Sequence, residues 1–339
     1  MDTARTVRIH QLGGPEVLQI ENLPLPEPKE GEVRIRVQAI GLNRAEVMFR
    51  TGQYVEQPQF PSRIGVEAAG VVDALGPGVQ GIQLGAKIGV ATGQSMGRYG
   101  TYGESVLVPA ASAIPYPSNV TAEEAASVWV QYLTAWFAFT EVAKLQPGQH
   151  VLITAATGGA GVGAIQIANL LGVRTIATTR SVSKKQALLE AGADHVIVTG
   201  SEDLVARLKE ITGGRGTELI FDPVAGKSLP TLAEAVAWGG NIILYGALEG
   251  ADVPYPLFTA FARNFALRTY MVYNFCGLAS LGLPRNEDAF GRAVRFINEN
   301  LASGKLKPLI AKTFPLDEVQ EAHRYMESNA QLGKIVLTV

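Results

Sequence analysis

Two patterns of apolar and polar positions divide this chain. Residues 33–39 alternate apolar and polar side chains, which is typical of a strand with one buried face. The proline-rich segment 24–31 predicts a loop. Residues 1–125 are therefore predicted to form a small β-rich, barrel-like domain. Further short strands are predicted between glycines, at 71–72, 87–90 and 105–108.

From about residue 128 the pattern changes to alternating strands and helices. Leu204, Leu208 and Ile211 share one face of a predicted helix, and residues 228–238 predict another. This alternation is typical of a parallel, doubly wound sheet, whose right-handed crossovers bring the carboxyl ends of the strands to one edge. The six predicted strands lie at 150–155, 173–178, 195–198, 217–221, 241–245 and about 267–272.

The C-terminal part of the chain carries a separate group of elements. Helical spacing predicts a helix over 286–303 and another over 317–327, with short strands at 308–310 and 334–339. Because the six-stranded sheet is already complete, we expect this part to return to the first domain.

The segment 150–164 carries the strongest chemical signal. An apolar strand runs into a glycine-rich turn and then into an apolar-faced helix. The spacing Ala156-x-Gly158-x-x-Gly161 is the dinucleotide-binding pattern with alanine in its first position. Glycines allow the backbone to approach a pyrophosphate, and the start of the helix offers unpaired N–H groups. A tight turn without a ligand is the alternative.

Composition and charge exclude several classes of protein. The chain has 29 Lys and Arg against 31 Asp and Glu, a net charge of −2, so nucleic acid and anionic membranes are not expected partners. No apolar stretch is long enough to span a bilayer, and residues 1–7 do not resemble a signal peptide. A single cysteine, Cys276, excludes an intramolecular disulfide. A cytoplasmic location is the expectation.

The chain resembles the medium-chain dehydrogenase/reductase superfamily, in its zinc-independent quinone oxidoreductase (zeta-crystallin-like) branch. The resemblance implies a GroES-like β-rich barrel domain, 1–127 and 299–339, and a Rossmann domain with a doubly wound, parallel six-stranded sheet, 128–298. It also implies an active cleft between them. The matching segments are 41–54, 65–72, 133–135, the turn at Ala156, 191–196, 323–328 and 333–336.

The resemblance also bears on zinc. Zinc-bearing relatives have cysteine where this chain has Asn43, and histidine where it has Val66; Glu67 alone remains. No metal site is expected, and Glu67 is interpreted as a structural carboxylate. Without a Lewis acid, the expected chemistry is hydride delivery to an acceptor that is already electrophilic.

The second strand of the nucleotide domain indicates the cofactor. An NAD-binding strand usually ends in Asp or Glu, whereas here it is followed by Arg180, Ser181 and Lys184. Cations and hydroxyls would form charge-assisted hydrogen bonds to a 2′-phosphate, a role that the family gives to a lysine at the Lys184 position. The prediction is NADP(H), and a solvated charge cluster is the alternative.

The resemblance places three catalytic candidates. Asn43 would lie near the nicotinamide ribose and substrate, although a turn residue is the alternative. Tyr54 could donate a hydrogen bond to a substrate carbonyl, or simply pack its loop. Thr134 would contact the nicotinamide, or bond its own helix backbone. The predicted cofactor-binding residues are Ala156, Thr157, Gly158, Gly159, Ala160, Gly161, Val162, Thr179, Arg180, Lys184, Thr199, Gly246, Ala247, Leu248, Tyr270, Met271 and Val272.

Seven aromatic residues gather within 255–275, too many for a solvated loop. They suggest a substrate wall, a dimer contact or both. The resembled enzymes pair through the edge strand of the Rossmann sheet, so a homodimer is expected. The seven residues are Tyr255, Phe258, Phe261, Phe265, Tyr270, Tyr273 and Phe275.

Three functions remain open. The first is an NADPH-dependent, zinc-independent reductase that delivers hydride to quinones or other small conjugated carbonyl acceptors. The second is a reductase of enoyl thioesters or enones (2-alkenals). Met48 favours it, because quinone reductases of the resembled branch often have tyrosine at this position. The third is a low-turnover, NADPH-binding protein with a crystallin-like or regulatory role.

Overall fold

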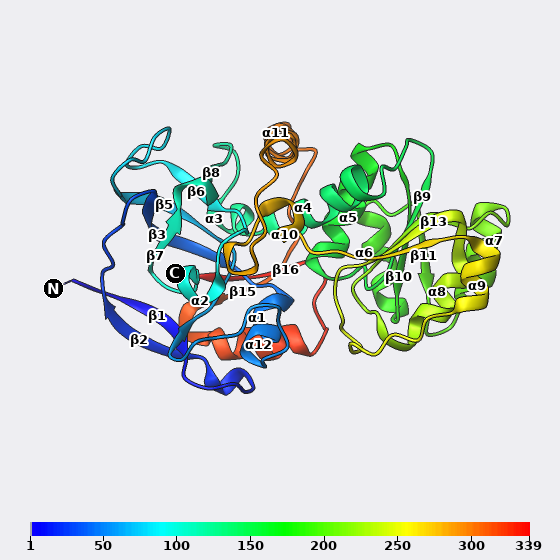
Figure 1. Ribbon diagram of the computed structural model, residues 1–339, viewed down its shortest axis with the longest axis horizontal. Coiled ribbons are helices and arrows are strands. Elements are labelled where there is room, and N and C mark those ends of the chain that lie inside the picture. The colour runs from blue at the N-terminus through cyan, green and yellow to red at the C-terminus, as the bar shows by residue number, and fades with distance from the viewer. Residues whose placement is uncertain (1) are drawn as a thin grey trace. The chain divides into compact units, whose positions relative to one another are not determined.

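The computed structural model describes residues 2–339 and divides the chain into two compact units (Figure 1). The first comprises Met1–Val130 and Val272–Val339, and the second Gln131–Met271. Residues 272–298, which the resemblance places in the Rossmann domain, are grouped with the first unit. There Asn298 donates a hydrogen bond to the carbonyl of Pro115 at 3.0 Å.

Strands dominate the first unit, as predicted. One sheet has the order β2-β1-β4, and a larger one has the order β15-β16-β3-β5-β6-β8, with β7 also paired to β3. The strands are β1 (Thr3–Ile9), β2 (Gln19–Pro24), β3 (Glu32–Gly41), β4 (Ser62–Arg63), β5 (Ala68–Leu75), β6 (Lys87–Val90), β7 (Ser105–Pro109), β8 (Ala113–Pro115), β15 (Ile310–Pro315) and β16 (Lys334–Thr338).

The C-terminal elements return to this unit, as expected. Strand β16 lies between β15 and β3, and its apolar residues join the core that β3 and β5 build. The predicted strand at 308–310 lies further along the chain, since β15 begins at Ile310. The helices are α1 (Arg44–Arg50), α2 (Met96–Tyr99), α3 (Ala122–Ala125), α10 (Tyr273–Cys276), α11 (Glu287–Ala302) and α12 (Val319–Glu327).

The second unit is the predicted doubly wound sheet. Its six strands are all parallel and have the order β11-β10-β9-β12-β13-β14. The central strands are almost entirely buried, as a sheet covered on both faces requires. The strands are β9 (His150–Ile153), β10 (Arg174–Thr179), β11 (His195–Val198), β12 (Thr217–Asp222), β13 (Val236–Leu244) and β14 (Ala266–Thr269).

Local signals explain where the helices of this unit begin and end. Helix α7 starts where the Asp203 side chain accepts the N–H of Ala206 at 2.8 Å, and stops at Gly213, which has a φ of 59°. The helix predicted over 228–238 ends at Ala235, because β13 begins at Val236 and continues through an irregular pairing with β12. The helices are α4 (Trp129–Phe137), which spans the boundary, α5 (Gly159–Leu170), α6 (Lys185–Glu190), α7 (Leu204–Thr212), α8 (Leu229–Ala235) and α9 (Leu257–Arg263).

Within residues 2–339 no helix combines the length and the apolar character that crossing a membrane would require.

Candidate functional site

The glycine-rich turn joins β9 to α5 in the second unit. The first backbone hydrogen bond of α5 runs from Val162 N–H to Gly158 O at 3.0 Å, so the preceding N–H groups face out of the start of the helix. A Cβ atom at Gly161 would lie 2.5 Å from backbone atoms of Ala156, so only glycine fits this close approach. Ala155 adopts a left-handed φ of 46°. The turn is therefore shaped to receive an anion.

The carboxyl end of β10 carries the predicted phosphate-binding cations. The hydroxyl of Thr179 accepts the N–H of Ser181 at 3.2 Å, and the Ser181 and Ser183 hydroxyls lie 2.7 Å apart. Arg180 is exposed, and burial and the charge of Arg180 lower the pKa of Lys184. Two cations and two hydroxyls therefore gather at one strand end. Thr199, which follows β11, donates its N–H to Thr179 O at 2.9 Å and extends the same edge.

The remaining predicted cofactor residues follow β13 and β14. A Cβ at Gly246 would meet Pro223 O at 2.8 Å, and Leu248 donates its N–H to the same carbonyl at 3.0 Å. Tyr270 donates its N–H to Leu244 O at 2.9 Å. The segments 246–248 and 270–271 therefore lie at the carboxyl edge of this sheet, as predicted, whereas Val272 belongs to the first unit.

Asp222 and Thr134 are two further polar residues of the second unit. Asp222, at the end of β12, accepts the Thr154 hydroxyl and the N–H of Ala225, and burial raises the pKa of its carboxyl. This aspartate therefore ties the end of β9 to the turn after β12. Thr134 lies on α4 and is nearly buried. One turn earlier on α4, the Gln131 side chain lies 3.3 Å from the Cβ position of Gly163, so this part of α4 packs on α5.

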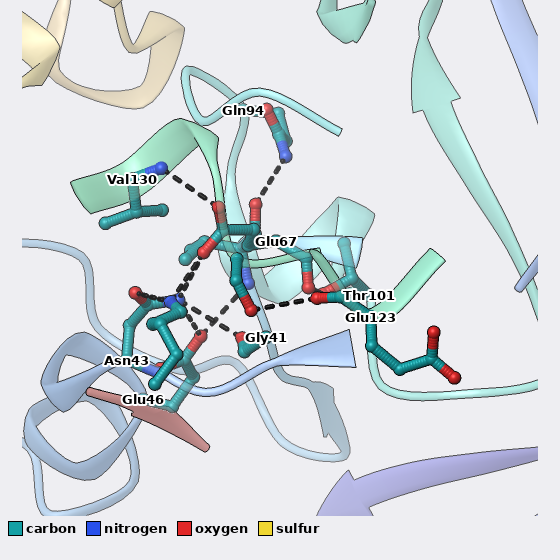
Figure 2. A network of polar contacts seen from close by, with 11 residues as sticks. Gly41, Asn43, Glu46, Glu67, Gln94, Thr101, Glu123 and Val130 are labelled. Atoms are coloured by element: carbon teal, nitrogen blue, oxygen red, sulfur yellow. Dashed lines mark hydrogen bonds and ion pairs between the residues drawn. The ribbon is translucent and has the colours of Figure 1, made fainter. Parts of the chain in front are cut away.

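Asn43 belongs to a polar network in the first unit (Figure 2). It precedes α1 and forms a capping box with Glu46, whose carboxylate accepts the Asn43 N–H at 2.6 Å. Its side-chain amide donates to Glu67 at 3.3 Å, and its carbonyl oxygen accepts from the ammonium of Lys334 at 2.7 Å. Asn43 therefore caps a helix, and its side chain belongs to a network of charges, while its place near the nicotinamide ribose stays a prediction.

Lys334 and Glu67 form a buried ion pair. Their Nζ and Oε2 atoms lie 2.7 Å apart, with side-chain exposures of 3% and 0%. Glu67 also accepts the N–H of Val130 at 3.1 Å, which agrees with its interpretation as a structural carboxylate. Sequence reasoning missed Lys334 as a member of this network, because a lysine at the start of a strand gives no local sign of a partner 267 residues away.

Glu46 is the second carboxylate of the network and is fully buried. Burial raises its pKa to about 7, although the charge of Lys334 opposes the shift. With Lys334 positive and Glu67 negative, a protonated Glu46 leaves the network neutral overall. The network is therefore a low-dielectric site whose charge changes near neutral pH.

Tyr54 lies in the loop after α1, and hydrogen bonds fix this loop in place. The carboxylate of Glu56 accepts the N–H of Met96 at 3.0 Å and the Ser95 hydroxyl, which fixes the loop to α2. The Tyr54 hydroxyl donates to the hydroxyl of Tyr273 at 3.0 Å. Burial, and then the neighbouring Tyr273, raise the pKa of Tyr54 well above its usual value.

Comparison with known proteins agrees with this architecture. The alcohol dehydrogenase GroES-like domain family matches residues 29–118, and the zinc-binding dehydrogenase family matches residues 159–285. Quinone oxidoreductase 1 of Escherichia coli is 31% identical over 98% of this chain and 99% of its own.

Solved structures are similar over nearly their whole length. The Escherichia coli quinone oxidoreductase complexed with NADPH superposes with a TM-score of 0.89, at 30% identity over 99% of this chain and 100% of that one. The CurK enoyl reductase gives a TM-score of 0.84 at 25% identity, over 99% of each chain.

The two units and the glycine-rich turn define a medium-chain dehydrogenase/reductase. Within that superfamily, the chain belongs to the quinone oxidoreductase branch.

The name of the matched dehydrogenase family raises the question of zinc, which the residues present do not fit. An amide, Asn43, and an apolar core residue, Val66, stand at the two ligand positions, and Glu67 is already paired with an ammonium. Among residues 2–339 no three His, Cys, Asp or Glu side chains gather as metal ligands.

Proposed function

We propose that this protein is an NADPH-dependent, zinc-independent reductase that delivers hydride to quinones or other small conjugated carbonyl acceptors. One observation supports this most strongly. The second unit keeps a complete anion-binding strand–turn–helix, while the first unit has a buried ammonium–carboxylate pair where zinc-bearing relatives have metal ligands.

The proposed cofactor is NADP(H). The turn at 156–162 would receive the pyrophosphate, and Arg180 and Lys184 would bind the 2′-phosphate with the help of Ser181. Thr179 and Thr199 would border the adenosine end, and the segments 246–248 and 270–272 the ribose and carboxamide. The Escherichia coli relative solved with NADPH supports this assignment.

The first unit would receive the acceptor. When bound, the reduced nicotinamide supplies the hydride. Asn43, held by Lys334 and Glu46, offers a fixed polar group. The hydrogen-bonded phenols Tyr54 and Tyr273 have one hydroxyl proton left, which can stabilise negative charge that develops on the acceptor oxygen. Thr134 is proposed to contact the nicotinamide side.

Reduction of enoyl thioesters or 2-alkenals is the second candidate. Met48 in place of tyrosine and the similarity to the CurK enoyl reductase favour it. This reaction also needs a proton delivered to carbon, and Tyr54 is a poor acid because its pKa is raised. A low-turnover, NADPH-binding protein of crystallin-like or regulatory function is the third candidate.

One acceptor panel separates these candidates. Purified protein is mixed with NADPH and, in turn, quinones, alkenals, enones and enoyl thioesters, and oxidation of NADPH is followed by absorbance. We expect quinones to give the highest kcat/KM. A much higher value for thioesters, enones or alkenals than for quinones would support the second candidate. Tight NADPH binding without turnover of any acceptor would support the third.

A homodimer through the edge of the six-stranded sheet is proposed as the assembly. Strand β14 is the last strand of that sheet, and exposed aromatic side chains stand on the nearby α9: Phe258 is 85% exposed and Phe261 72%. Burial of these rings would favour association of two copies. Light scattering should give twice the chain mass, and Phe258→Ser with Phe261→Ser should lower it. No nucleic acid or membrane partner is proposed.

A further inference from the structure

The seven aromatic residues of 255–275 do not share one environment. Phe258 and Phe261 are exposed in the second unit, whereas Tyr273 begins α10 in the first unit and is only 4% exposed. Its hydroxyl lies 3.0 Å from that of Tyr54, which is 219 residues away along the chain. Tyr273 therefore forms a polar contact within the first unit and does not share the exposed environment of Phe258 and Phe261.

Tyr54 and Tyr273 each have one hydroxyl proton, and one of the two forms the hydrogen bond between them. Tyr54 is the donor in this pair, so its oxygen retains only acceptor capacity. The proton left for a further hydrogen bond is that of Tyr273. A hydroxyl that already accepts a hydrogen bond is polarised and becomes a stronger donor.

Unsatisfied polar atoms lie on the segment that follows β6. Thr92 and Gln94 are 1% and 3% exposed, yet the Thr92 hydroxyl and the Gln94 side-chain oxygen have no hydrogen-bond partner within residues 2–339. The Thr92 side chain faces the Tyr273 hydroxyl, but not at hydrogen-bonding geometry. The nitrogen of Gln94 is used, since it donates to Val66 O at 3.3 Å (Figure 2). Buried polar atoms of this kind are costly unless a ligand or water completes them.

We propose that Tyr273 is a further catalytic residue, whose hydroxyl donates a hydrogen bond to the carbonyl oxygen of the acceptor, while Tyr54 behind it acts as a positioning residue. The hydroxyl of Thr92 completes the oxygen site beside Tyr273. This inference rests on the proposed reductase function, because only a reducible carbonyl develops negative charge at that oxygen during hydride delivery.

The acidity of the two phenols is consistent with this division. Burial raises the pKa of Tyr273 to about 12, while the nearby Thr92 hydroxyl and the hydrogen bond accepted from Tyr54 oppose the rise. Burial, and then the neighbouring Tyr273 to which it donates its proton, raise the pKa of Tyr54 well above its usual value. Because the Tyr54 proton is already used in this bond, Tyr273 is the phenol of the pair whose proton is left for a developing oxyanion.

Tyrosine-to-phenylalanine variants test the assignment, because each removes one hydroxyl and keeps the ring. Tyr273→Phe should lower kcat/KM for the acceptor by about 100-fold, as loss of one oxyanion donor does elsewhere. Tyr54→Phe should lower it by about tenfold, through the lost polarisation. The double variant should be no slower than Tyr273→Phe alone, because Tyr54 acts through Tyr273. The dissociation constant of NADPH should stay unchanged in all three.

Tyr102→Phe is the matched control. Tyr102 is a buried phenol of the same unit, bonded to His323 at 3.1 Å, and it has no place in the proposed site. It should lose stability and keep its kcat/KM. A Tyr273→Phe variant within twofold of the unaltered protein, or a greater loss in Tyr54→Phe than in Tyr273→Phe, would overturn the assignment. So would losses in the two single variants that multiply in the double variant.

A binding measurement separates failure of this inference from failure of the proposed function. The probe is 4-nitrophenolate, an anionic oxygen ligand, titrated into the protein with NADP⁺ and followed by its absorbance. Tyr273→Phe should weaken this binding about tenfold, whereas Tyr102→Phe should not. If the unaltered protein reduces no acceptor but shows this pattern, the proposed function fails and the oxygen site stands. If the unaltered protein turns over acceptors and Tyr273→Phe changes neither measurement, the oxygen site fails alone.

Discussion

The two units of this chain handle charge in opposite ways. Five Asp, Glu, Lys or Arg side chains are buried among the described residues of the first unit: Glu32, Glu46, Arg50, Glu67 and Lys334. Among the described residues of the second unit, Asp222 is the one buried side chain of these four types. The second unit has Arg180 and Lys184 at the end of β10, one exposed and the other half-buried. A buried charge destabilises the fold unless it is paired, so the stability of the first unit depends on these pairs. The stability of the second unit depends mainly on its apolar sheet.

A second cluster in the first unit follows the same rule. Arg50 is completely buried, donates to Gly13 O at 2.7 Å and pairs with Glu327, 277 residues away. His323 lies between Arg50 and Tyr102, and burial lowers the pKa of its imidazole to about 3. Polar contacts between residues that are far apart in the sequence therefore hold the first unit together.

The sharpest way to break this contrast is to remove the buried ammonium. Lys334→Met should lower the free energy of unfolding by about 3–5 kcal/mol, because Glu67 is left as an uncompensated buried charge. Urea unfolding followed by tryptophan fluorescence measures the loss. The double variant with Glu67→Gln should recover most of it, and Lys87→Met, at an exposed lysine, should lose almost nothing. A loss below about 1 kcal/mol in Lys334→Met would contradict the pairing argument.

Glu46 gives the contrast a pH dependence. Its folded-state pKa of about 7 is above the ordinary 4.5, so the folded state holds a proton that the unfolded state releases between these values. Glu46 therefore ionises in the unfolded state while it stays protonated in the folded state. The free energy of unfolding falls as pH rises from about 4.5 to 7, by up to about 3 kcal/mol.

His323 acts in the opposite direction. Its folded pKa of about 3 lies below the ordinary 6.5, so its contribution is present above about pH 6.5 and is lost as pH falls. The two slopes offset one another between about pH 4.5 and 6.5. Glu46→Gln should therefore make stability rise with pH over this range, measured by urea unfolding at pH 4.5, 5.5 and 6.5. An unchanged, flat profile would contradict the assignment.

In the second unit, backbone approach should matter more than charge. Gly161→Ala should cost about 1–3 kcal/mol, since its Cβ would lie 2.5 Å from backbone atoms of Ala156, and it should weaken NADPH binding by displacing the turn. Gly158→Ala is the control, because the nearest atom to its Cβ position is Ala155 O at 3.8 Å. Equal effects of the two substitutions on the NADPH dissociation constant would count against the close-approach argument.

The smallest effect on stability is expected from the surface cations. Arg180→Asp combined with Lys184→Ala should change the free energy of unfolding by less than about 0.5 kcal/mol. The ratio of kcat/KM for NADPH to that for NADH should nevertheless fall at least about tenfold, because charge-assisted hydrogen bonds to the 2′-phosphate are lost. Lys209→Ala, at an exposed lysine of α7, should leave that ratio unchanged. A ratio that does not move in the double variant would exclude these residues from the phosphate site.

This contrast also explains what the sequence could predict. The six strands of the second unit follow local apolar segments, and the turn at Ala156 is readable because strand, glycines and helix are contiguous. The start of β13 was less readable, because residues 236–240 continue an apolar pattern that suits either a helix or a strand. Local periodicity thus predicts a unit built from consecutive strand–helix repeats.

The first unit was predicted less completely, for the same physical reason. Its strands alternate visibly, but the partners of its buried polar groups come from distant parts of the chain. Lys334 has no local sequence signal for a partner, and the structure shows it paired with Glu67 and Asn43. The contact of Tyr54 with Tyr273 left no signal either, since both residues are equally suited to simple packing.

The position of β16 has a consequence for the newly made chain. This strand pairs with residues 39–41 of β3, and its first residue, Lys334, supplies the counter-charge of Glu67. A polypeptide released before residue 334 would keep an open sheet edge and an unneutralised interior carboxylate at the same time. Such a truncated product should be prone to aggregation and proteolysis, although residues 131–271 would already be complete.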